Sequence, residues 1–520
     1  MVKYIRRLYL KRTIPTNPKT RSSSKLIPSR TQFKSHKPET PFKSFSTISL
    51  LILLYSCAIG PDYAPPEIEV PEQFDAEEKH VEAVQVDAWW ETFDDPVLVR
   101  CIEEALTSNK DLAASFQRIR IARAMRRMES SRFWPDIDAN LSYTVDRLSE
   151  NNPRFQDAIR IGLFPRDVEY WDTGFDVNWE IDVFGGTRRR VEGAVARIEE
   201  EAYQQQALTI TVAAEVARNY LEIVGNQQKL EILEAKITNE EKRIQILQQK
   251  HRSGLISENQ IFKSQSRKQE FQSLKPKLQA DVQAGQYRLA VLMGRRPEEV
   301  VSGLSINRPL PISAGQVPVG LPSDLLLRRP DILAAERKLA AATADIGAAK
   351  ADFFPRFYLT GSPKLESGDF SDLFNSASTA WMFGPKVSWK IFSGARNKAQ
   401  LETARAVREQ TFIEYEIVVN KALEEVESNL TRYGKEAQSL HFVTAAMDSK
   451  QRELDIQFMK RQTGLSDYIV VADSRREWLD AKWNRLGQQV VVLTRIVALY
   501  KSLGGGWNQA GEMENRPDHK

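Results

Sequence analysis

The chain has 520 residues, of which 42% are hydrophobic and 27% charged, so it is neither a disordered protein nor a polytopic helical membrane protein. Twelve of the 73 Lys and Arg residues but only one of the 69 acidic residues lie in 1–56, so the rest of the chain is acidic and we expect no nucleic-acid partner. The two cysteines nearly exclude a disulfide framework, and the five histidines are too far apart for a metal-ligand spacing, so we expect neither a metal site nor a cofactor.

Residues 1–56 indicate a signal or leader peptide. A basic, Ser- and Pro-rich stretch is followed by an apolar run of about a dozen residues, which is too short to span a bilayer but suits a signal-peptide core. Leu54-Tyr55-Ser56-Cys57 resembles a bacterial lipobox, so we expect Cys57 to carry the lipid of an outer-membrane lipoprotein. A buried cysteine after an ordinary signal peptide is the alternative. Residues 57–87 are expected to be an extended amino-terminal segment.

The rest of the chain is a duplication. Trp171 and Trp179 recur 210 residues later as Trp381 and Trp389, and Gly254-Leu255 recurs as Gly464-Leu465 at the same offset. Phe133-Trp134-Pro135 recurs as Phe353-Phe354-Pro355 at an offset of 220. Between Trp179 and Arg188 the first copy is expected to have two residues more than the second has between Trp389 and Arg396. The predicted repeats are 88–310 and 320–505, and the polar tail 506–520 is expected to be disordered.

Each repeat is predicted to contain one long helical hairpin, over 188–293 in the first copy and 396–502 in the second. From Arg188 to Arg252 there is no proline, and Leu230, Leu233, Ile237, Ile244 and Leu247 fall on the a and d positions of one heptad frame. A helix over 188–252 would be about 100 Å long at 1.5 Å per residue. Such lengths indicate coiled hairpins rather than an ordinary compact helical bundle.

A pair of strands precedes each hairpin, with expected ranges of about 137–146, 171–183, 357–365 and 381–392. Apolar and polar residues alternate with period two in these ranges, which is typical of outer-membrane β-strands, although a soluble half-buried sheet has the same pattern. Each Trp pair is eight residues apart, roughly 26 Å along a strand, so Trp171, Trp179, Trp381 and Trp389 are candidates for two aromatic girdles.

Four strands cannot close a barrel, and lipid tolerates no open sheet edge, so the chain must oligomerise. Three copies would give a barrel of twelve strands continued by a helical tube, although strand counting alone also allows two or four copies. The predicted fold is therefore mixed but mainly α, with a duplicated strand pair and long helical hairpins. In a homotrimer this fold forms a transmembrane β-barrel and a periplasmic α-barrel.

Several motifs occur together in a family-specific order: the lipobox, Gly60-Pro-Asp-Tyr63, Trp89-Trp90, the Leu- and Arg-rich run from Gly320 to Asp331, and Ala351-Asp-Phe-Phe-Pro355. In this order the chain resembles the outer-membrane factors of tripartite efflux pumps, relatives of TolC and OprM. The similarity is greatest to the lipoprotein branch often called the NodT type. The resemblance implies a trimer in outer-membrane lipid, a periplasmic adaptor (membrane fusion) protein and an inner-membrane transporter of the resistance-nodulation-division (RND) type. It also implies passive conduction of small molecules to the exterior.

The resemblance also assigns a gate and two contact sites. Asp473 matches a ring aspartate that closes the periplasmic end, whereas Val470 stands where some relatives have a second aspartate. Asp467 and Tyr468 are candidates for hydrogen bonds that hold the gate closed. The tip turns at Gly254, Leu255, Gly464 and Leu465 are expected to meet the adaptor. If Asp473 is not a gate residue, it is an ordinary solvated helix residue.

Three other functions compete with the channel. An enzyme is not expected, because the chain has no nucleophile elbow, zinc motif or Ser/His/Asp context. A protein channel of type I secretion and a non-channel coiled-coil envelope lipoprotein are the remaining alternatives. The run Arg188-Arg189-Arg190 could suggest a nucleic-acid patch, but its position at a helix start after a strand favours a place near lipid headgroups.

Overall fold

The computed structural model describes residues 58–71, 74, 88–154, 156–163, 165–301, 308–311 and 322–505. The leader, Cys57 and the tail 506–520 lie outside the described residues, and so does most of 72–87. The described residues all belong to one compact unit, which extends from Ser56 to the carboxyl end. Among them, no helix has an apolar stretch long enough to cross a membrane.

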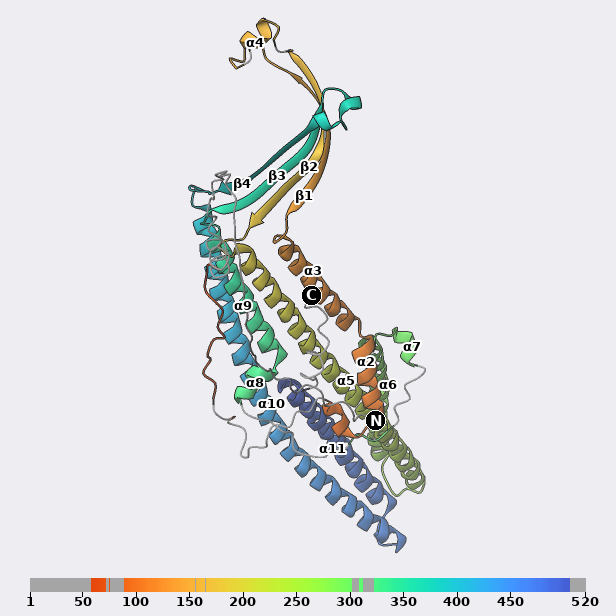
Figure 1. Ribbon diagram of the computed structural model, residues 1–520. Coiled ribbons are helices and arrows are strands. Elements are labelled where there is room, and N and C mark those ends of the chain that lie inside the picture. Colours follow the sequence, from red (N-terminus) through yellow and green to blue (C-terminus); the bar gives the residue numbers. More distant parts are fainter. Residues whose placement is uncertain are drawn as a thin grey trace, which may run out of the picture. The chain divides into compact units, whose positions relative to one another are not determined.

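The first repeat contains two long helices, two strands and several short helices (Figure 1). In chain order its elements are η1 (Trp89–Phe93), α2 (Pro96–Ser108), α3 (Lys110–Ser131), β1 (Asp136–Arg147), α4 (Gln156–Arg160), β2 (Asp167–Ile181), α5 (Gly186–Arg252), α6 (Asn259–Leu292) and α7 (Pro297–Val301). The second repeat follows the same plan. Its elements are α8 (Pro322–Arg328), α9 (Pro330–Ala351), β3 (Arg356–Ser367), η2 (Phe370–Asp372), η3 (Ser376–Ser378), β4 (Thr379–Ser388), α10 (Arg396–Gln462) and α11 (Tyr468–Ser502).

The duplication is visible residue by residue. Helices α3 and α9 both have 22 residues, and α5 and α10 both have 67. Gly185 and Ala395, 210 positions apart, hold the same left-handed N-cap, with φ of 77° and 65°. The expected two-residue difference before these helices is therefore wrong. The expected difference arose because Arg188 was matched with Arg396. In the structure the equivalent residues are the two N-caps, Gly185 and Ala395.

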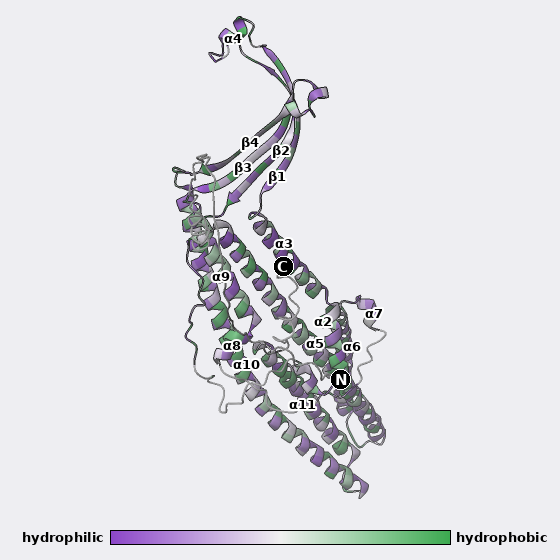
Figure 2. Ribbon diagram, viewed as in Figure 1, coloured by the Kyte–Doolittle hydropathy of each residue, from purple (hydrophilic) through white to green (hydrophobic). Residues whose placement is uncertain are grey.

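The four strands form one antiparallel sheet in the order β1-β2-β3-β4. Directly paired residues share a face, so the register decides which side chains lie together. Ile137 pairs with Val177, Val177 with Gly361, and Gly361 with Phe383, which makes a row across all four strands. The next rows hold Asp136 opposite Asn178 and Asp138 opposite Asp176. One face is therefore apolar and the other polar, and Figure 2 shows the two kinds of residue interleaved along the strands.

The strand ends differ from the expected ranges by a few residues. Strand β2 runs from Asp167 to Ile181 instead of 171–183, because β1 supplies partners as far as Arg147. Strand β4 stops at Ser388, so Trp389 lies just beyond it. Ser388 pairs with Arg356, the first residue of β3, and the preceding Pro355 has no N–H to extend the ladder.

The helices pack in two orders that meet on the long helices. Near the sheet the contacts run α3-α5-α9-α10, and toward the hairpin tips they run α6-α5-α11-α10. The largest buried cluster includes Trp89, Phe93 and Tyr220. Trp89 stacks on Tyr500 of α11 with ring centroids 5.4 Å apart, and the Tyr220 hydroxyl donates to Asp95, 2.7 Å away. This cluster joins the start of the first repeat to the end of the second.

Candidate functional site

Both hairpin tips have the same geometry. Gly254 and Gly464 have φ of +74° and +77°, and the N–H of the next leucine donates to a carbonyl five residues back at 2.9 and 2.8 Å. Glycine suits both positions because a left-handed backbone disfavours other residues. Leu255 and Leu465 are left 72% and 80% exposed. Each tip therefore presents an unburied apolar side chain at a rigid turn.

The first hairpin contacts the second through a series of polar interactions between α5 and α11. On α5 the residues are spaced by three, four and seven positions, so they lie on one helix face. The contacts are Lys236 Nζ to Asp480 (2.8 Å), Asn239 Nδ2 to the Ala472 carbonyl (2.9 Å), Arg243 to Asp473, and Lys250 to Asp467. We call this set the α5–α11 ladder. Lys236 also lies 4.8 Å from the Trp483 ring centroid, which adds a cation–π contact at the buried end.

Asp473 is held by two arginines. Its carboxylate accepts from Arg243 of α5 and, at 2.6 Å, from Arg476 one turn further along α11. The two arginine side chains are largely buried, whereas that of Asp473 is 34% exposed. The expected acidic residue thus lies within a locally positive group, which weakens its attraction for cations and makes it a link between helices. Neither arginine belongs to a motif, so neither could be picked out from the sequence.

Asp467 and Tyr468 lie at the start of α11. Asp467 caps the helix by accepting from the Ile469 N–H at 3.3 Å, and it also accepts from Lys250 at the end of α5. The hydrogen bond from Lys250 lowers the pKa of Asp467 below its ordinary value, and the backbone hydrogen bonds act in the same direction. The Tyr468 ring lies under Arg461, 4.8 Å from its guanidinium carbon. Asp467 therefore bridges the two hairpins, whereas Tyr468 packs within its own hairpin.

Glu240 is a fully buried carboxyl group in the ladder region. It occupies a d position of the predicted heptad frame, between the buried Leu233 and Leu247. Burial raises its pKa, against the opposing effect of Arg243, Arg476 and Arg267. A glutamate in an apolar seam is a signal that the sequence offers, although Glu240 was not among the expected site residues.

The four candidate girdle tryptophans lie at two levels of the sheet. The indole N–H of Trp179 donates to the Phe133 carbonyl at 2.9 Å, and Trp389 donates to Phe353 in the equivalent way at 3.0 Å. Trp171 packs against Tyr143, with centroids 4.7 Å apart, and Trp381 lies exposed near Phe383. Trp179 and Trp389 are thus fixed next to the ends of α3 and α9. Trp171 and Trp381 lie toward the other end of the sheet.

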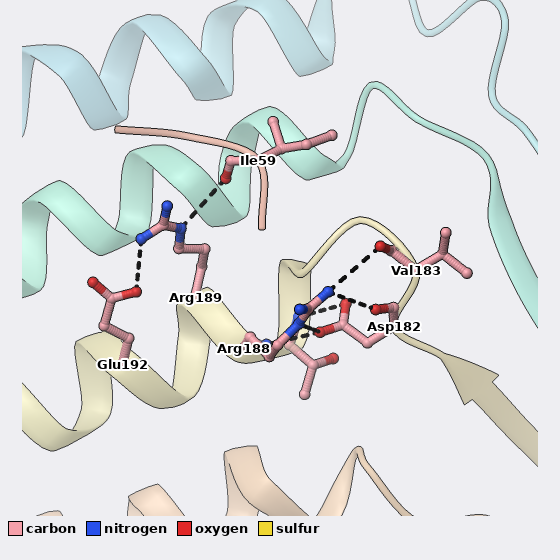
Figure 3. Close-up of polar contacts among 7 residues, drawn as sticks. Ile59, Asp182, Val183, Arg188, Arg189 and Glu192 are labelled. Carbon is pink, nitrogen blue, oxygen red and sulfur yellow. Dashed lines mark hydrogen bonds and ion pairs between the residues drawn. The ribbon is translucent and has the colours of Figure 1, made fainter. Parts of the chain in front are cut away.

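The arginines at the start of α5 are not a free basic patch. Arg188 reaches Asp182 and the Val183 carbonyl (Figure 3). Arg190 lies 3.5 Å from Asp352. Arg189 pairs with Glu192 on its own helix and with Asp62 of the amino-terminal segment. Each guanidinium therefore already has carboxylate partners, which argues against nucleic-acid binding at this place.

Comparison with protein families gives a match over both repeats. The family described as outer membrane efflux protein matches residues 101–295 and 321–505. These two ranges hold most of the described chain, including the ladder and both tips.

Individual relatives match almost from end to end. The solvent efflux pump outer membrane protein SrpC of Pseudomonas putida is 30% identical over 476 residues, covering 90% of this chain and 99% of its own. The cation efflux system protein CusC of an Escherichia coli O6:H1 strain is 28% identical over 468 residues, covering 88% and 97%. The nodulation protein T of Rhizobium leguminosarum is 25% identical over 471 residues, covering 90% and 98%. Among solved structures, the outer-membrane channel OprN superposes with a TM-score of 0.78 at 32% identity, over 87% of this chain and all of OprN.

Proposed function

The chain belongs to the outer membrane efflux protein family, and from that premise we propose that three copies form one continuous exit duct from the periplasm to the exterior. Its family consists of outer-membrane channels of tripartite efflux pumps and not of enzymes, so its function is passage across the outer membrane. Family membership also argues against the non-channel coiled-coil alternative. The observation that carries the assembly proposal is the set of edges that one copy leaves open.

The sheet and the two rows of packed helices each have an element of the first repeat at one edge and an element of the second repeat at the other. The sheet runs from β1 to β4, the helices near the sheet from α3 to α10, and the helices near the tips from α6 to α10. Apolar side chains are exposed on these edge helices, including Phe116 and Met125 on α3 and Ile413 and Ile417 on α10. Joining the last edge of one copy to the first edge of the next closes all three layers by a single rotation. Twelve strands then satisfy the edge hydrogen bonds that lipid would leave unpaired.

The two faces of the sheet support a lipid-facing exterior and a polar lumen. Val177, Phe383 and their row are apolar, whereas Asp176 and Asn178 lie on the opposite face. The four candidate girdle tryptophans would then lie at the two membrane interfaces. Cys57 would add a lipid anchor at the amino terminus, next to Ala58.

We further propose that the α5–α11 ladder holds the periplasmic end closed. Its members join the two hairpins of one copy, and the ion pairs nearest the tips are those of Asp473 in α11 and of Asp467, the N-cap of α11. Opening by outward movement of the second hairpin would have to break both ion pairs. The exposed Leu255 and Leu465 at the tip turns are the surfaces offered to a periplasmic adaptor, whose binding would supply the required free energy.

The partners and cargo follow from the same reasoning. An inner-membrane transporter of the RND type would provide the energy, because the family's members are outer-membrane components of tripartite pumps. SrpC is named for solvents and CusC for cations, although both resemble this chain over most of its length. The transporter and adaptor would therefore select the cargo, and the duct would pass small molecules of different kinds.

Two measurements test the duct. Purified protein in a planar bilayer should give discrete conductance steps. If no steps are seen, the channel function is contradicted. Cysteines placed on the polar face of the edge strands, Asp138→Cys in β1 and Lys386→Cys in β4, should give a ladder of cross-linked species that ends at three copies. Products ending at two or four copies would overturn the proposed number, and each single-cysteine variant is the control.

A further inference from the structure

The residues directly after Cys57 are bound in a notch between α5 and α9. Arg189 of α5 donates to the Ile59 carbonyl at 3.4 Å (Figure 3). The Ile59 N–H donates to the Phe184 carbonyl at 3.1 Å. Arg189 also donates to the Gly60 carbonyl at 3.5 Å and to Asp62 at 2.7 Å. We call residues 58–63 the strap. Ala58, the first described residue of the strap, lies against Gly185 at the turn between β2 and α5.

The notch fits the strap closely. Gly60 has φ of +125°, and a Cβ atom there would lie 2.5 Å from the Gly347 Cα of α9. A Cβ at Gly185 would lie 2.6 Å from the Ala58 Cα, and one at Gly347 would lie 2.8 Å from the Arg189 Cγ. Contacts this short require that none of the three residues carries a side chain. At its far end the strap reaches α9, where the Tyr63 hydroxyl donates to Glu336 and Arg337 lies 5.5 Å from the ring.

Arg189 depends on the strap for its hydrogen bonds. Its side chain is 5% exposed, and of its four acceptors three belong to residues 59, 60 and 62, while only Glu192 lies on its own helix. A buried guanidinium is costly unless its donors are satisfied. Without the strap, Arg189 would lose most of its hydrogen-bond acceptors while it stayed buried, so an empty notch would be energetically unfavourable.

The duplication shows that the notch is present once. Position 399, which is equivalent to Arg189 at the offset of 210, holds alanine, and position 127, equivalent to Gly347 at the offset of 220, holds arginine. Other equivalent positions keep their residues, for example Asn219 and Asn429. The repeats thus diverge at the two residues that make the notch, and a chain has only one amino terminus to bind.

We propose that this notch is the docking site of the acylated amino terminus and that it fixes the lipid of Cys57 beside the turn between the sheet and the helices. Ala58 lies against Gly185 at this turn, and adjacent Cα atoms are about 3.8 Å apart, so an acyl group on the preceding residue would start close to the turn. Phe184 packs there against Phe354 and Phe357, with centroids 4.7 and 6.3 Å apart, and offers an apolar surface for acyl chains. Arg189 is then a positioning residue for the anchor. The placement rests on the proposed acylation, whereas the docking of the strap does not.

Hydrogen exchange of the full-length protein in lipid nanodiscs tests the docking. The peptide that covers the strap should be protected in the wild type, and Arg189→Ala should speed its exchange about tenfold or more, because several charge-assisted hydrogen bonds are lost. Gly60→Ala should do the same without changing α5. The controls are Arg197→Ala, which removes an ion pair to Asp345 between the same two helices, and Gly162→Ala, a positive-φ glycine with open space. Equal exchange in the wild type and Arg189→Ala, or equal loss of protection in Arg197→Ala, would overturn the docking.

Photo-cross-linking tests the position of the lipid. Cells are fed a palmitate that carries a diazirine, and the cross-linked peptides are mapped on the purified protein. The wild type should cross-link mainly to 181–184 and 354–357, and Arg189→Ala should spread the cross-links over the sheet. An unchanged pattern in Arg189→Ala would overturn the positioning role. Failure to incorporate palmitate at all would overturn the lipid anchor, and hydrogen exchange would still decide whether the strap docks.

Discussion

Breaking the Arg243–Asp473 pair should open the periplasmic end of the channel, by an amount that depends on which partner is removed. Arg243→Ala leaves Asp473 bonded to Arg476 and removes one partly exposed, charge-assisted contact, worth about 1–2 kcal/mol per protomer. Asp473→Ala leaves two largely buried guanidinium groups, on Arg243 and Arg476, without their shared acceptor. Its cost to the closed state should be larger, about 2–3 kcal/mol. In each protomer the ratio of open to closed gate should therefore rise about 5- to 30-fold in the first variant and further in the second.

Single-channel conductance of the purified trimer measures this order directly. Lys268→Ala is the matched control, because Lys268 pairs with Glu241 at 3.0 Å within the first hairpin and does not join the two hairpins. It should leave the closed state unchanged. Conductance in Arg243→Ala and Asp473→Ala that equals the control, or a larger effect from Arg243→Ala than from Asp473→Ala, would refute the ladder as a lock.

Trivalent cations distinguish a lock from an acidic ring. If Asp473 faces the pore, Arg243→Ala removes a competing positive charge and should strengthen block by a trivalent cation from the periplasmic side. Asp473→Ala should abolish that block. A block of equal strength in the wild type and in both variants would place the cation site elsewhere.

Three further predictions concern the membrane face, a tip turn and pH. Val177→Arg should reduce trimer assembly far more than Asn178→Arg, because an arginine on the lipid face costs roughly 2–4 kcal/mol at the bilayer midplane; equal trimer yields on gels would contradict the assigned faces. Gly464→Ala should destabilise the tip by about 1–2 kcal/mol in thermal unfolding because its φ is +77°, whereas Gly434→Ala, inside α10 with open space, should be neutral or stabilising. The pKa of Asp467 is lowered in the folded protein, so its contact with Lys250 contributes stability above the ordinary aspartate range and loses it as the pH falls through the lowered value. Asp467→Asn should therefore flatten the acid limb of the closed-state conductance profile, and an unchanged profile would exclude this contact.

Local patterns in the sequence carried much of the fold. The period-two alternation around Val177 and the proline-free stretch after Arg188 describe properties of consecutive residues, and the fixed offsets of the duplication relate equivalent residues such as Trp179 and Trp389. The tip turns at Gly254 and Gly464 were found in the same way, because a left-handed turn requires a particular residue at one position. The one error of alignment arose at the start of the long helices, where matching residue types misled and only the backbone shows that Gly185 corresponds to Ala395.

The partners of the site residues could not be read from the sequence. Asp473 was identified by resemblance alone, and its bond to Arg243 joins residues 230 positions apart on helices that the sequence leaves unplaced. The ladder needed the packing of α5 on α11 before the charges on their facing sides could be paired. Glu240 differs in that its place at a d position of the heptad frame would have allowed its burial to be predicted, although it was not among the expected site residues.

By itself, the sequence determined the duplication, the two faces of each strand and the length of the hairpins. These features depend on repeats and periodic patterns that can be read along the chain. Only the tertiary structure decided what each charge is bonded to and where the amino-terminal strap lies. Arg189 and Gly347 are 158 positions apart in the chain and ordinary in their local sequence. They make a notch for Gly60 because α5 and α9 pack together. A close contact between two distant segments produces no periodic pattern in the sequence of either segment.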